Sequence, residues 1–513
     1  MTVTAPSLPA HARALILIAT ILGTSMVFID GTVVNIALPV VQRDLHATAI
    51  DMQWVVNAYT LFLAALMLVG GSLGDHYGRR LVFVIGTIVF AAASAWCGFA
   101  PDVNHLIFAR GLQGIGSALL TPGSLAIISA TFEGRARGHA IGTWSSFSAL
   151  TTAFGPALGG IIVQYASWRW IFFINIPLAI AVIAACFAGV PETRDTERVH
   201  HLDWTGSVLA TIGLGGLTYG LITAGATGFG DPKVIAGLVI GVVTLAAFVI
   251  WEGRAKAPMM PLDLFKSPTF SGTNALTFLL YAALGGVLFF VPFNLIQVQH
   301  YAPSVAGLTM LPFVVLMVLL SPWAGGLVAQ YGSKLPLTIG PLIATAGLAL
   351  FALPSVGGSY WTTFFPAFVL LGLGMSVTVA PLTTTVLESA TEAHVGLASA
   401  INNAIARAAG LFAVAAFSLI VLSVFGARLD AGVARVNAPG VPMQQVAAEM
   451  HAQRANLAQA QIPADAPPQV RDQLKDVVVS SYVAGFRAAM LAGALFALIG
   501  ALIAAAFIPA RPA

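Results

Sequence analysis

Long apolar runs fill most of this 513-residue sequence and recur from one end to the other. Each run is near or above the ~20 residues that a helix needs to cross ~30 Å of hydrocarbon. Because lipid offers no hydrogen-bond partners to the backbone, a chain with many such runs folds as a bundle of membrane-spanning helices. We expect fourteen spans, at residues 14–41, 53–74, 81–100, 105–130, 138–165, 170–190, 204–223, 233–251, 269–296, 303–328, 335–354, 360–387, 396–426 and 482–508.

Composition excludes several other classes of protein. Charged residues make up 8% of the chain, against about 25% in soluble domains. The net charge of +3 is too small to indicate a nucleic-acid partner. Two cysteines, Cys97 and Cys186, provide neither a disulfide scaffold nor a zinc site. No phosphate-binding loop of the form G-x-x-x-x-G-K-[ST] occurs, which argues against an ATP-driven pump.

Orientation follows from the lysines and arginines in the short loops, which are enriched on the cytoplasmic side. With the N-terminus inside, the inner short loops carry ten of them, Arg79 and Arg80 included, and the outer short loops carry three. We therefore expect a multi-pass plasma (inner) membrane protein with both termini in the cytoplasm.

An internal repeat indicates two related halves. The segment Gly71–Arg80 after the second span matches Gly325–Lys334 after the tenth, with Gly, Leu, Tyr, Gly and a final cation at the same spacing. Repeated halves are typical of secondary transporters. The repeat predicts a six-helix half at 1–190, two inserted helices and a linker at 191–268, and a second six-helix half at 269–513.

Asp30 lies midway along the first span, where an ionised carboxyl costs on the order of 3 kcal/mol or more. We interpret it as a titrating group that faces a watery cavity. The alternative is a carboxyl that only holds helices together through hydrogen bonds. A membrane receptor or scaffold without transport would not require Asp30 and Arg110 to be buried together, so we favour a transporter.

Two arginines are the other buried charges that we predict. Arg110 lies ~8 Å deep in the fourth span and Asp30 ~16 Å deep in the first, at 1.5 Å per residue, so the two can communicate directly or through water. Arg110 can instead cap carbonyls or extend outward. Arg407, in the thirteenth span, is equally consistent with a structural partner for a neighbouring helix and with a substrate contact.

Several motifs together resemble the major facilitator superfamily, and in particular its fourteen-helix drug:proton antiporters. The inner loop Gly71-x-Leu73-x-Asp75-x-x-Gly78-Arg79-Arg80 is similar to the signature loop of the superfamily. The other matching stretches are Asp30–Pro39, Arg110–Gly116, Gly155-Pro156-Ala-Leu-Gly159-Gly160, Trp168–Pro177 and Pro381–Thr385.

The resemblance implies an all-α integral membrane protein with the major facilitator fold, which is two six-helix halves plus two inserted helices. It implies proton coupling through Asp30 and Arg110, and gating through the Gly71–Arg80 loop. The helix with Gly155, Pro156, Gly159 and Gly160 would seal the cavity against leak, although those small residues also have a packing explanation. The sequence departs from the family pattern at Thr151, where a glycine is usual, and it lacks acids midway along the tenth and thirteenth spans. That second departure argues against the export of divalent cations.

The function that we expect is proton-coupled export of amphipathic or cationic drugs by alternating access. The alternative is a transporter of the same fold for one endogenous metabolite, such as an antibiotic, a lipid or an amino acid. We expect no enzymatic activity, no cofactor besides the coupling proton, no metal and no nucleic-acid partner. The protein is expected to be a monomer in the lipid bilayer. The sequence leaves open whether a periplasmic adaptor protein joins it. Candidate cavity residues are Trp54, Tyr59, Gln113, Phe290, Asn294, Asn402 and Arg407. For each of them taken singly, a position packed inside the bundle or facing lipid is the alternative.

One loop is large. Residues 427–481 are polar and interrupted by prolines, and residues 443–460 could form an amphipathic helix. A structured cap and a loose linker are both consistent with this composition. We expect the segment to lie outside the transmembrane core, so that removal of residues 443–468 leaves a folded, inserted protein.

Overall fold

The computed structural model describes residues 9–194, 203–256, 258–390, 395–436, 438, 441–463 and 466–510. Every regular element within these residues is a helix. Fourteen segments are long and apolar enough to cross a membrane, and they overlap all fourteen predicted spans. The predicted all-α membrane fold is therefore confirmed, while residues 195–202, in the predicted linker region, lie outside the described part of the chain.

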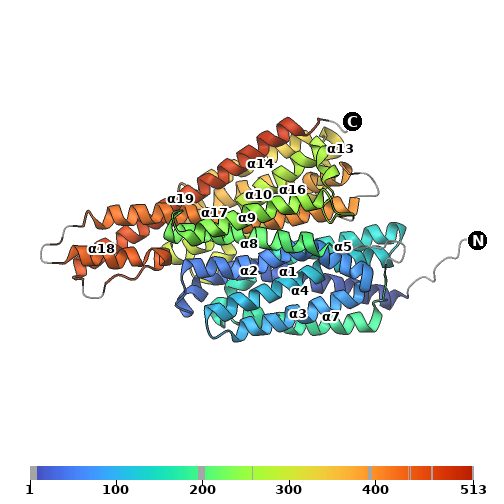
Figure 1. Cartoon of the computed structure of the whole chain (residues 1–513), viewed down its shortest axis with the longest axis horizontal. Coiled ribbons are helices and arrows are strands. Elements are labelled where there is room, and N and C mark those ends of the chain that lie inside the picture. The colour runs from blue at the N-terminus through green and yellow to red at the C-terminus, as the bar shows by residue number, and fades with distance from the viewer. Residues whose placement is uncertain are drawn as a thin grey trace, which may run out of the picture.

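The N-terminal half forms one layer of the molecule (Figure 1). Its spans run back and forth with short connections, and the sixth span is formed by two consecutive helices. These helices are α1 (Ala10–Asp44), α2 (Ala49–Tyr77), α3 (Arg79–Phe99), α4 (Val103–Thr131), α5 (Gly134–Tyr165), α6 (Trp170–Phe173) and α7 (Asn175–Gly189).

The C-terminal half forms the second layer (Figure 1). Several of its spans are interrupted by proline or by a short irregular turn. Its elements are α10 (Pro268–Phe293), η2 (Asn294–Val298), α11 (Pro303–Thr309), α12 (Leu311–Gly325), α13 (Leu327–Tyr331), α14 (Lys334–Phe351), α15 (Tyr360–Thr363), α16 (Phe365–Glu388), α17 (Val395–Val433), α18 (Met443–Ala452), η4 (Arg454–Gln459) and α19 (Pro468–Phe507).

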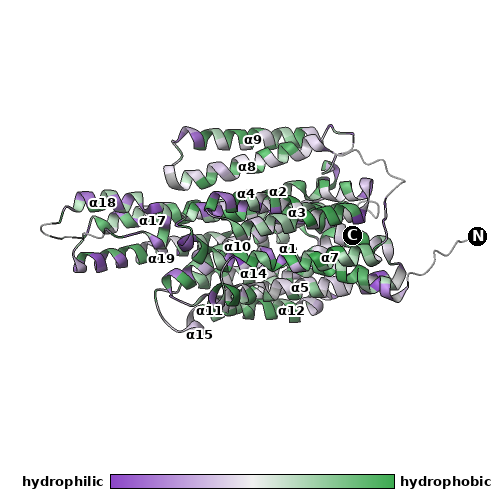
Figure 2. Cartoon of the chain, turned by 90° about the horizontal axis from the view of Figure 1, so that it is seen from below, coloured by the Kyte–Doolittle hydropathy of each residue, from purple (hydrophilic) through white to green (hydrophobic). Residues whose placement is uncertain are grey.

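The two inserted helices, α8 (Trp204–Thr227) and α9 (Pro232–Glu252), lie at the edge of the bundle (Figure 2). Glycines bring their backbones close together, because a Cβ on Gly216 would lie 2.9 Å from the Gly237 carbonyl oxygen. The helix pair contacts α2 and α17, one from each half. A short helix, η1 (Leu262–Lys266), then leads into the C-terminal half.

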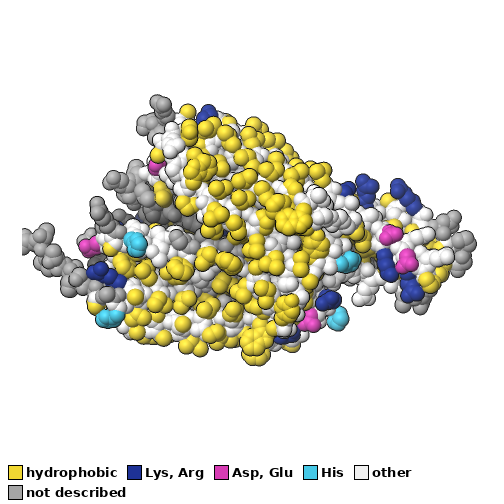
Figure 3. Space-filling model, turned by 180° about the vertical axis from the view of Figure 1, so that it is seen from behind, with side chains coloured by type: hydrophobic (Ala, Val, Ile, Leu, Met, Phe, Trp, Pro, Cys, Tyr) yellow, Lys and Arg dark blue, Asp and Glu magenta, His cyan; other side chains and the backbone are white. Residues whose placement is uncertain are grey.

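The two ends of the bundle differ in shape. The start of α1 and the end of α19 lie at the same end of the bundle, which we name the terminal end (Figure 1). The other, the projecting end, carries an extension of α17, α18, η4 and α19 beyond the bundle. Helices α17 and α19 have 39 and 40 residues, so each is ~58–60 Å long at 1.5 Å per residue and exceeds the ~30 Å hydrocarbon core. On the face seen in Figure 3, apolar side chains cover most of the bundle, while charged side chains gather on the extension and at the two ends of the bundle.

The extension is a packed structure. Of the two alternatives for this segment, a structured cap and a loose linker, the structure has the cap. Val446 and Met450, one turn apart on α18, are buried together with Leu457 in the same core as α17 and α19. Arg454 forms an ion pair with Asp430 of α17. The predicted amphipathic helix is thus present, although it ends at Ala452 and a 3-10 turn follows.

We expect replacement of residues 443–466 by a short Gly-Ser linker to leave an inserted protein with a lower melting temperature. Insertion depends on the spans, whereas the loss of three buried side chains removes about 1.5–3 kcal/mol for each. Fluorescence-detected size-exclusion chromatography after heating measures this shift. Gln459→Ala is the matched control, because it leaves the buried side chains in place. A protein that fails to reach the membrane would contradict the expectation.

Candidate functional site

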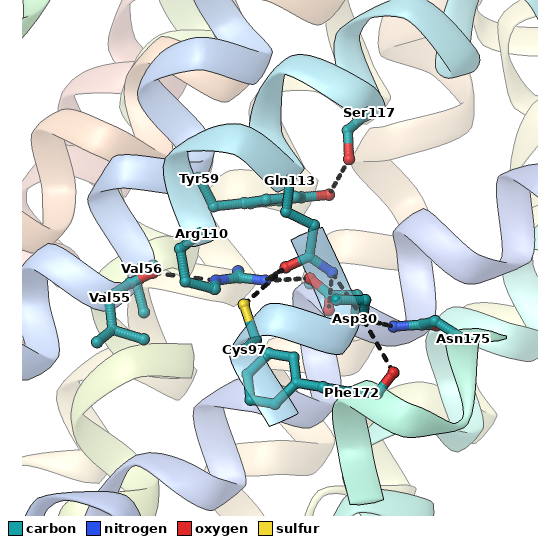
Figure 4. Close-up of polar contacts among 12 residues, drawn as sticks. Asp30, Val55, Val56, Tyr59, Cys97, Arg110, Gln113, Ser117, Phe172 and Asn175 are labelled. Atoms are coloured by element: carbon teal, nitrogen blue, oxygen red, sulfur yellow. Dashed lines mark hydrogen bonds and ion pairs between the residues drawn. The ribbon is translucent and has the colours of Figure 1, made fainter. Parts of the chain in front are cut away.

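Asp30 of α1 and Arg110 of α4 form an ion pair inside the N-terminal half (Figure 4). The distance between Arg110 Nη1 and Asp30 Oδ2 is 2.5 Å, and the two side chains are 2% and 0% exposed. The sequence left open whether Asp30 and Arg110 communicate directly or through water, and the structure has the direct contact. It also corrects one prediction, because the Asp30 carboxylate is sealed from the surrounding space in this conformation and does not face a cavity.

Neighbouring side chains complete the hydrogen bonding of the pair. Arg110 Nη1 also donates to Gln113 Oε1 at 2.7 Å, and Gln113 Nε2 donates to the second Asp30 oxygen at 2.8 Å. Arg110 Nε donates to the Val55 carbonyl at 3.1 Å. The guanidinium carbon lies 4.2 Å from the centre of the Tyr59 ring, a distance that suits a cation–π contact. We call Asp30, Tyr59, Arg110 and Gln113 the charge cluster.

Glycines in α4 make the charge cluster possible. A Cβ on Gly114 would lie 2.3 Å from the Tyr59 carbonyl oxygen, and one on Gly116 would lie 2.6 Å from the Phe90 backbone nitrogen. Helix α4 therefore packs backbone to backbone on α2 and α3, which brings Arg110 within reach of α1. The Arg110–Gly116 motif thus supplies both the cation and the close packing that positions it.

Mutual neutralisation stabilises the charge cluster in its low-dielectric surroundings. Removing one member of a buried pair costs roughly 3–5 kcal/mol, because the remaining charge has no partner. A proton on Asp30 would likewise leave Arg110 without its counterion. The cluster can therefore exist in two arrangements, one ionised and closed and the other protonated and rearranged.

The predicted gating loop lies at the terminal end, and it is shorter than predicted, because residues 71–77 belong to α2, Gly78 forms the turn and Arg79 begins α3. Arg79 Nη2 is 2.8 Å from Asp75 Oδ1, so these two residues, one helical turn apart, form an ion pair. Gly78 has φ +125°, a conformation that side chains rarely adopt. Sequence reasoning missed Glu192, whose carboxylate accepts from the backbone N–H groups of Arg80 at 3.0 Å and Leu81 at 3.1 Å. It thereby caps the N-terminus of α3.

We expect Asp75→Asn, Arg79→Ala and Glu192→Gln to slow transport of every substrate to a similar degree. These side chains lie at the terminal end, and Asp75 is ~24 Å along α2 from Tyr59 of the charge cluster at 1.5 Å per residue. They therefore affect how the helices move and not what binds. Efflux rates for several dyes at matched membrane expression measure the effect. A variant that loses only one dye would contradict this prediction, and Lys266→Gln is a control at an exposed ion pair on the linker.

The glycine motif of α5 contacts both halves of the molecule. A Cβ on Gly155 would lie 1.9 Å from Thr32 Oγ1, and one on Gly159 would lie 3.0 Å from the Val33 carbonyl oxygen, both on α1. Gly160 faces the other half instead, since its Cβ would lie 2.3 Å from the carbonyl oxygen of Pro303 on α11. The motif thus packs α5 within its own half and also against the C-terminal half.

The described hydrogen bonds between the two halves all lie at the projecting end. Gln297 donates to Gln42 at 3.0 Å, the Ser304 backbone N–H donates to Gln164 at 3.1 Å, and Gln459 donates to the Pro39 carbonyl at 3.2 Å. With the α5–α11 backbone contact, they close the space between the halves at that end.

Space remains between the halves near the middle of the spans. A Cβ on Gly31 of α1 or on Gly410 of α17 would meet no heavy atom within 4 Å. Phe28 and Arg407, one from each half, contact each other beside this space, with 5.8 Å between the guanidinium carbon and the ring centre.

The other candidate cavity residues lie elsewhere, which corrects their predicted placement. Trp54 packs on Tyr219 of the inserted helix α8, with 6.3 Å between the ring centres. Phe290 and Asn294 are each 2% exposed and are buried in the core of the C-terminal half. Asn402 Nδ2 donates to Asn274 and Thr277 of α10 at 3.0 and 2.8 Å, so it joins two helices. Tyr59 and Gln113 belong to the charge cluster.

Comparison with known proteins gives consistent results. The sequence model of the Major Facilitator Superfamily matches residues 20–415. The chain is 34% identical to the tetracenomycin C resistance and export protein of Streptomyces glaucescens, over 84% of this chain and 80% of that protein. It is also 34% identical to the multidrug resistance protein Stp of Mycobacterium tuberculosis (strain CDC 1551 / Oshkosh), over 77% and 73% of the two chains.

Solved structures share the fold at low sequence identity. A bacterial homologue of the human lysosomal transporter Spinster, in an inward-facing and unoccupied conformation, aligns with a TM-score of 0.61 and 16% identity over 98% of this chain and 100% of that chain. The D-xylose–proton symporter aligns with a TM-score of 0.59 and 15% identity over 97% and 98% of the two chains. Motifs, fold and sequence relatives agree, and the chain therefore belongs to the major facilitator superfamily of multi-pass membrane transporters.

Proposed function

We propose that this protein exports amphipathic toxic compounds, antibiotics among them, in exchange for protons. The observation that carries the proposal is the sealed Asp30–Arg110 pair beside a space between two halves that are closed at one end. The names of similar proteins support the substrate class, because tetracenomycin C, puromycin and lincomycin resistance proteins are at least 32% identical to this chain over three quarters of its length or more.

The terminal end is assigned to the cytoplasm in this proposal, since the arginine-rich loop Gly71–Arg80 lies there. The structure then corresponds to a state closed toward the outside. A substrate enters from the cytoplasm or the inner leaflet and binds in the space between the halves. The halves then rock, and the substrate leaves on the outer side.

The charge cluster would couple this motion to protons. In the outward-open state, water reaches Asp30 and brings a proton to it from the outer solution, and Arg110 is released from its counterion. Return to the inward-facing state deprotonates Asp30 and re-forms the ion pair. A single chain contains both halves, so we propose that the monomer is the transport unit and that it needs neither a cofactor nor a catalytic group. An exchange that moves net charge gains ~2.3 kcal/mol per charge per 100 mV of membrane potential.

Inverted membrane vesicles with an imposed pH gradient test this function. We expect several unrelated amphipathic dyes and antibiotics to accumulate in the vesicles and to compete with one another. Nigericin, which dissipates the pH gradient, should stop the accumulation. Transport that ignores the gradient would contradict proton coupling, whereas a response to one compound alone would favour the alternative of a single endogenous substrate.

A further inference from the structure

The charges in the membrane interior do not balance. Within the bundle, and away from the helix ends, the described parts of the spans carry Asp30, Arg110 and Arg407. Arg487 of α19 donates to the carbonyl oxygens of Leu353 and Pro354, in the loop beyond α14, and therefore lies at the projecting end. The first two charges neutralise each other at 2.5 Å. Arg407 therefore leaves a net charge of about +1 near the middle of the bundle.

Arg407 has no anionic partner among the described residues. No described carboxylate lies within 4.0 Å of it, and no described acceptor forms a hydrogen bond with it. Its contact is with the face of the Phe28 ring, whose centre lies 5.8 Å from the guanidinium carbon. A guanidinium has five N–H donors that match carboxylates. Leaving them unmatched inside a membrane protein is costly, which favours a ligand that supplies the acceptor.

The space beside Arg407 is open to a ligand. Asn403, Arg407 and Gly410 follow i, i+4, i+7 spacing, so they share one face of α17. That side of α17 is open, since Arg407 is partly exposed, Asn403 is exposed and a Cβ on Gly410 would meet nothing within 4 Å. Gly31 of α1, one turn beyond Phe28, is open in the same way. The guanidinium and an aromatic ring therefore border the same space between the halves.

We propose that Arg407 binds an acidic group of the exported compound, such as a carboxylate, phenolate or enolate, while Phe28 packs on the adjoining apolar or aromatic surface. This inference rests on the proposed export function and narrows its substrate class to acidic amphipathic compounds. Cationic compounds, which the sequence alone also suggested, fit this space less well. Arg407 repels them, and the Asp30 carboxylate is already fully used by Arg110 and Gln113.

Three pyrene probes of equal size test the proposal. They are 1-pyrenebutyrate, its neutral methyl ester and a pyrenebutyl-trimethylammonium cation, and their binding to the purified full-length protein in nanodiscs is followed by fluorescence. We expect the acid to bind at least about tenfold more tightly than the cation, since charge-assisted hydrogen bonds are the strong ones. Arg407→Gln should remove this difference while affinity for the ester stays the same. Arg407→Lys should keep most of the preference, because it keeps the charge.

Arg428→Gln is the matched control, on the same helix but in the extension, and it should bind all three probes as the wild type does. Equal affinity of the wild type for acid and cation would overturn the proposal. A second result would also overturn it. In that result, Arg407→Gln stays monodisperse but loses affinity for all three probes equally, and Arg407→Lys does not prefer the acid to the cation. Transport separates the two proposals, because selective binding of the acid without any transport driven by a pH gradient would contradict the export function and leave the Arg407 site standing.

Discussion

We expect Asp30→Asn to abolish transport that is driven by a pH gradient. The amide has the size of the carboxyl but takes up no proton, so the charge cluster cannot switch between its two arrangements. Proton-driven dye transport by reconstituted protein measures the loss, together with binding of the same dye to show that the site is still formed. Wild-type transport by this variant would remove Asp30 from the mechanism.

Stability measurements alone do not separate a coupling role of Asp30 from a purely structural one. Asn leaves the Arg110 charge without its counterion, so some thermal destabilisation is expected in either case. Asp30→Glu separates the two roles, because it keeps the negative charge and moves it by about one methylene. If Asp30 couples protons, Asp30→Glu should retain partial transport with a shifted pH optimum. Asp44→Asn is the matched control, since Asp44 lies at the end of the same helix, with a half-exposed side chain paired to Arg169.

Gly160→Val is expected to lower transport about tenfold or more, because overpacking costs ~1–3 kcal/mol and ~1.4 kcal/mol is a factor of ten. The added side chain would overlap the Pro303 carbonyl and the Ser304 backbone of the opposite half. Neither backbone group can rotate away, so the overlap is relieved by separating the halves at the projecting end. The variant should therefore fold normally and populate a state that is open at that end.

Thiol accessibility measures this shift. The chain has two cysteines, Cys97 and Cys186, and both are buried. In a background that lacks them, Gln297→Cys reports on the closed end, because Gln297 bonds there to Gln42 of the other half. Gly160→Val should increase labelling of this cysteine by a membrane-impermeant maleimide. Gly138→Val, on the same helix but in open space, should not. Unchanged labelling together with unchanged transport would contradict the account of the closure.

The spans and the repeated loop could be predicted because hydrophobic length and glycine spacing are local properties of the sequence. The direction in which a side chain points could not be. A span is apolar on all sides, so its periodicity does not identify the face that meets another helix. Trp54 and Phe290 were therefore predicted to line a cavity, but they pack against α8 and inside the C-terminal half.

Long-range polar contacts set a second limit. Glu192 caps a helix that begins more than a hundred residues earlier, and an acid that follows a proline at the end of a span is only a weak signal for this role. The direct contact of Asp30 with Arg110 could be anticipated from their depths in two spans. Its sealed environment could not, because it depends on the close approach of α4 to α2 at Gly114.

The extension beyond the bundle has a mechanical consequence. Its two long helices, α17 and α19, belong wholly to the C-terminal half, and each continues without a break from the bundle into the extension. Any rotation of that half swings the extension as a lever arm, and the displacement is largest at its tip. The Gln459–Pro39 hydrogen bond is where this arm is fastened to the other half, so it must be released each time the arm swings. A binder that clamps the arm to the N-terminal half would therefore stall the cycle from outside the membrane without reaching the substrate space.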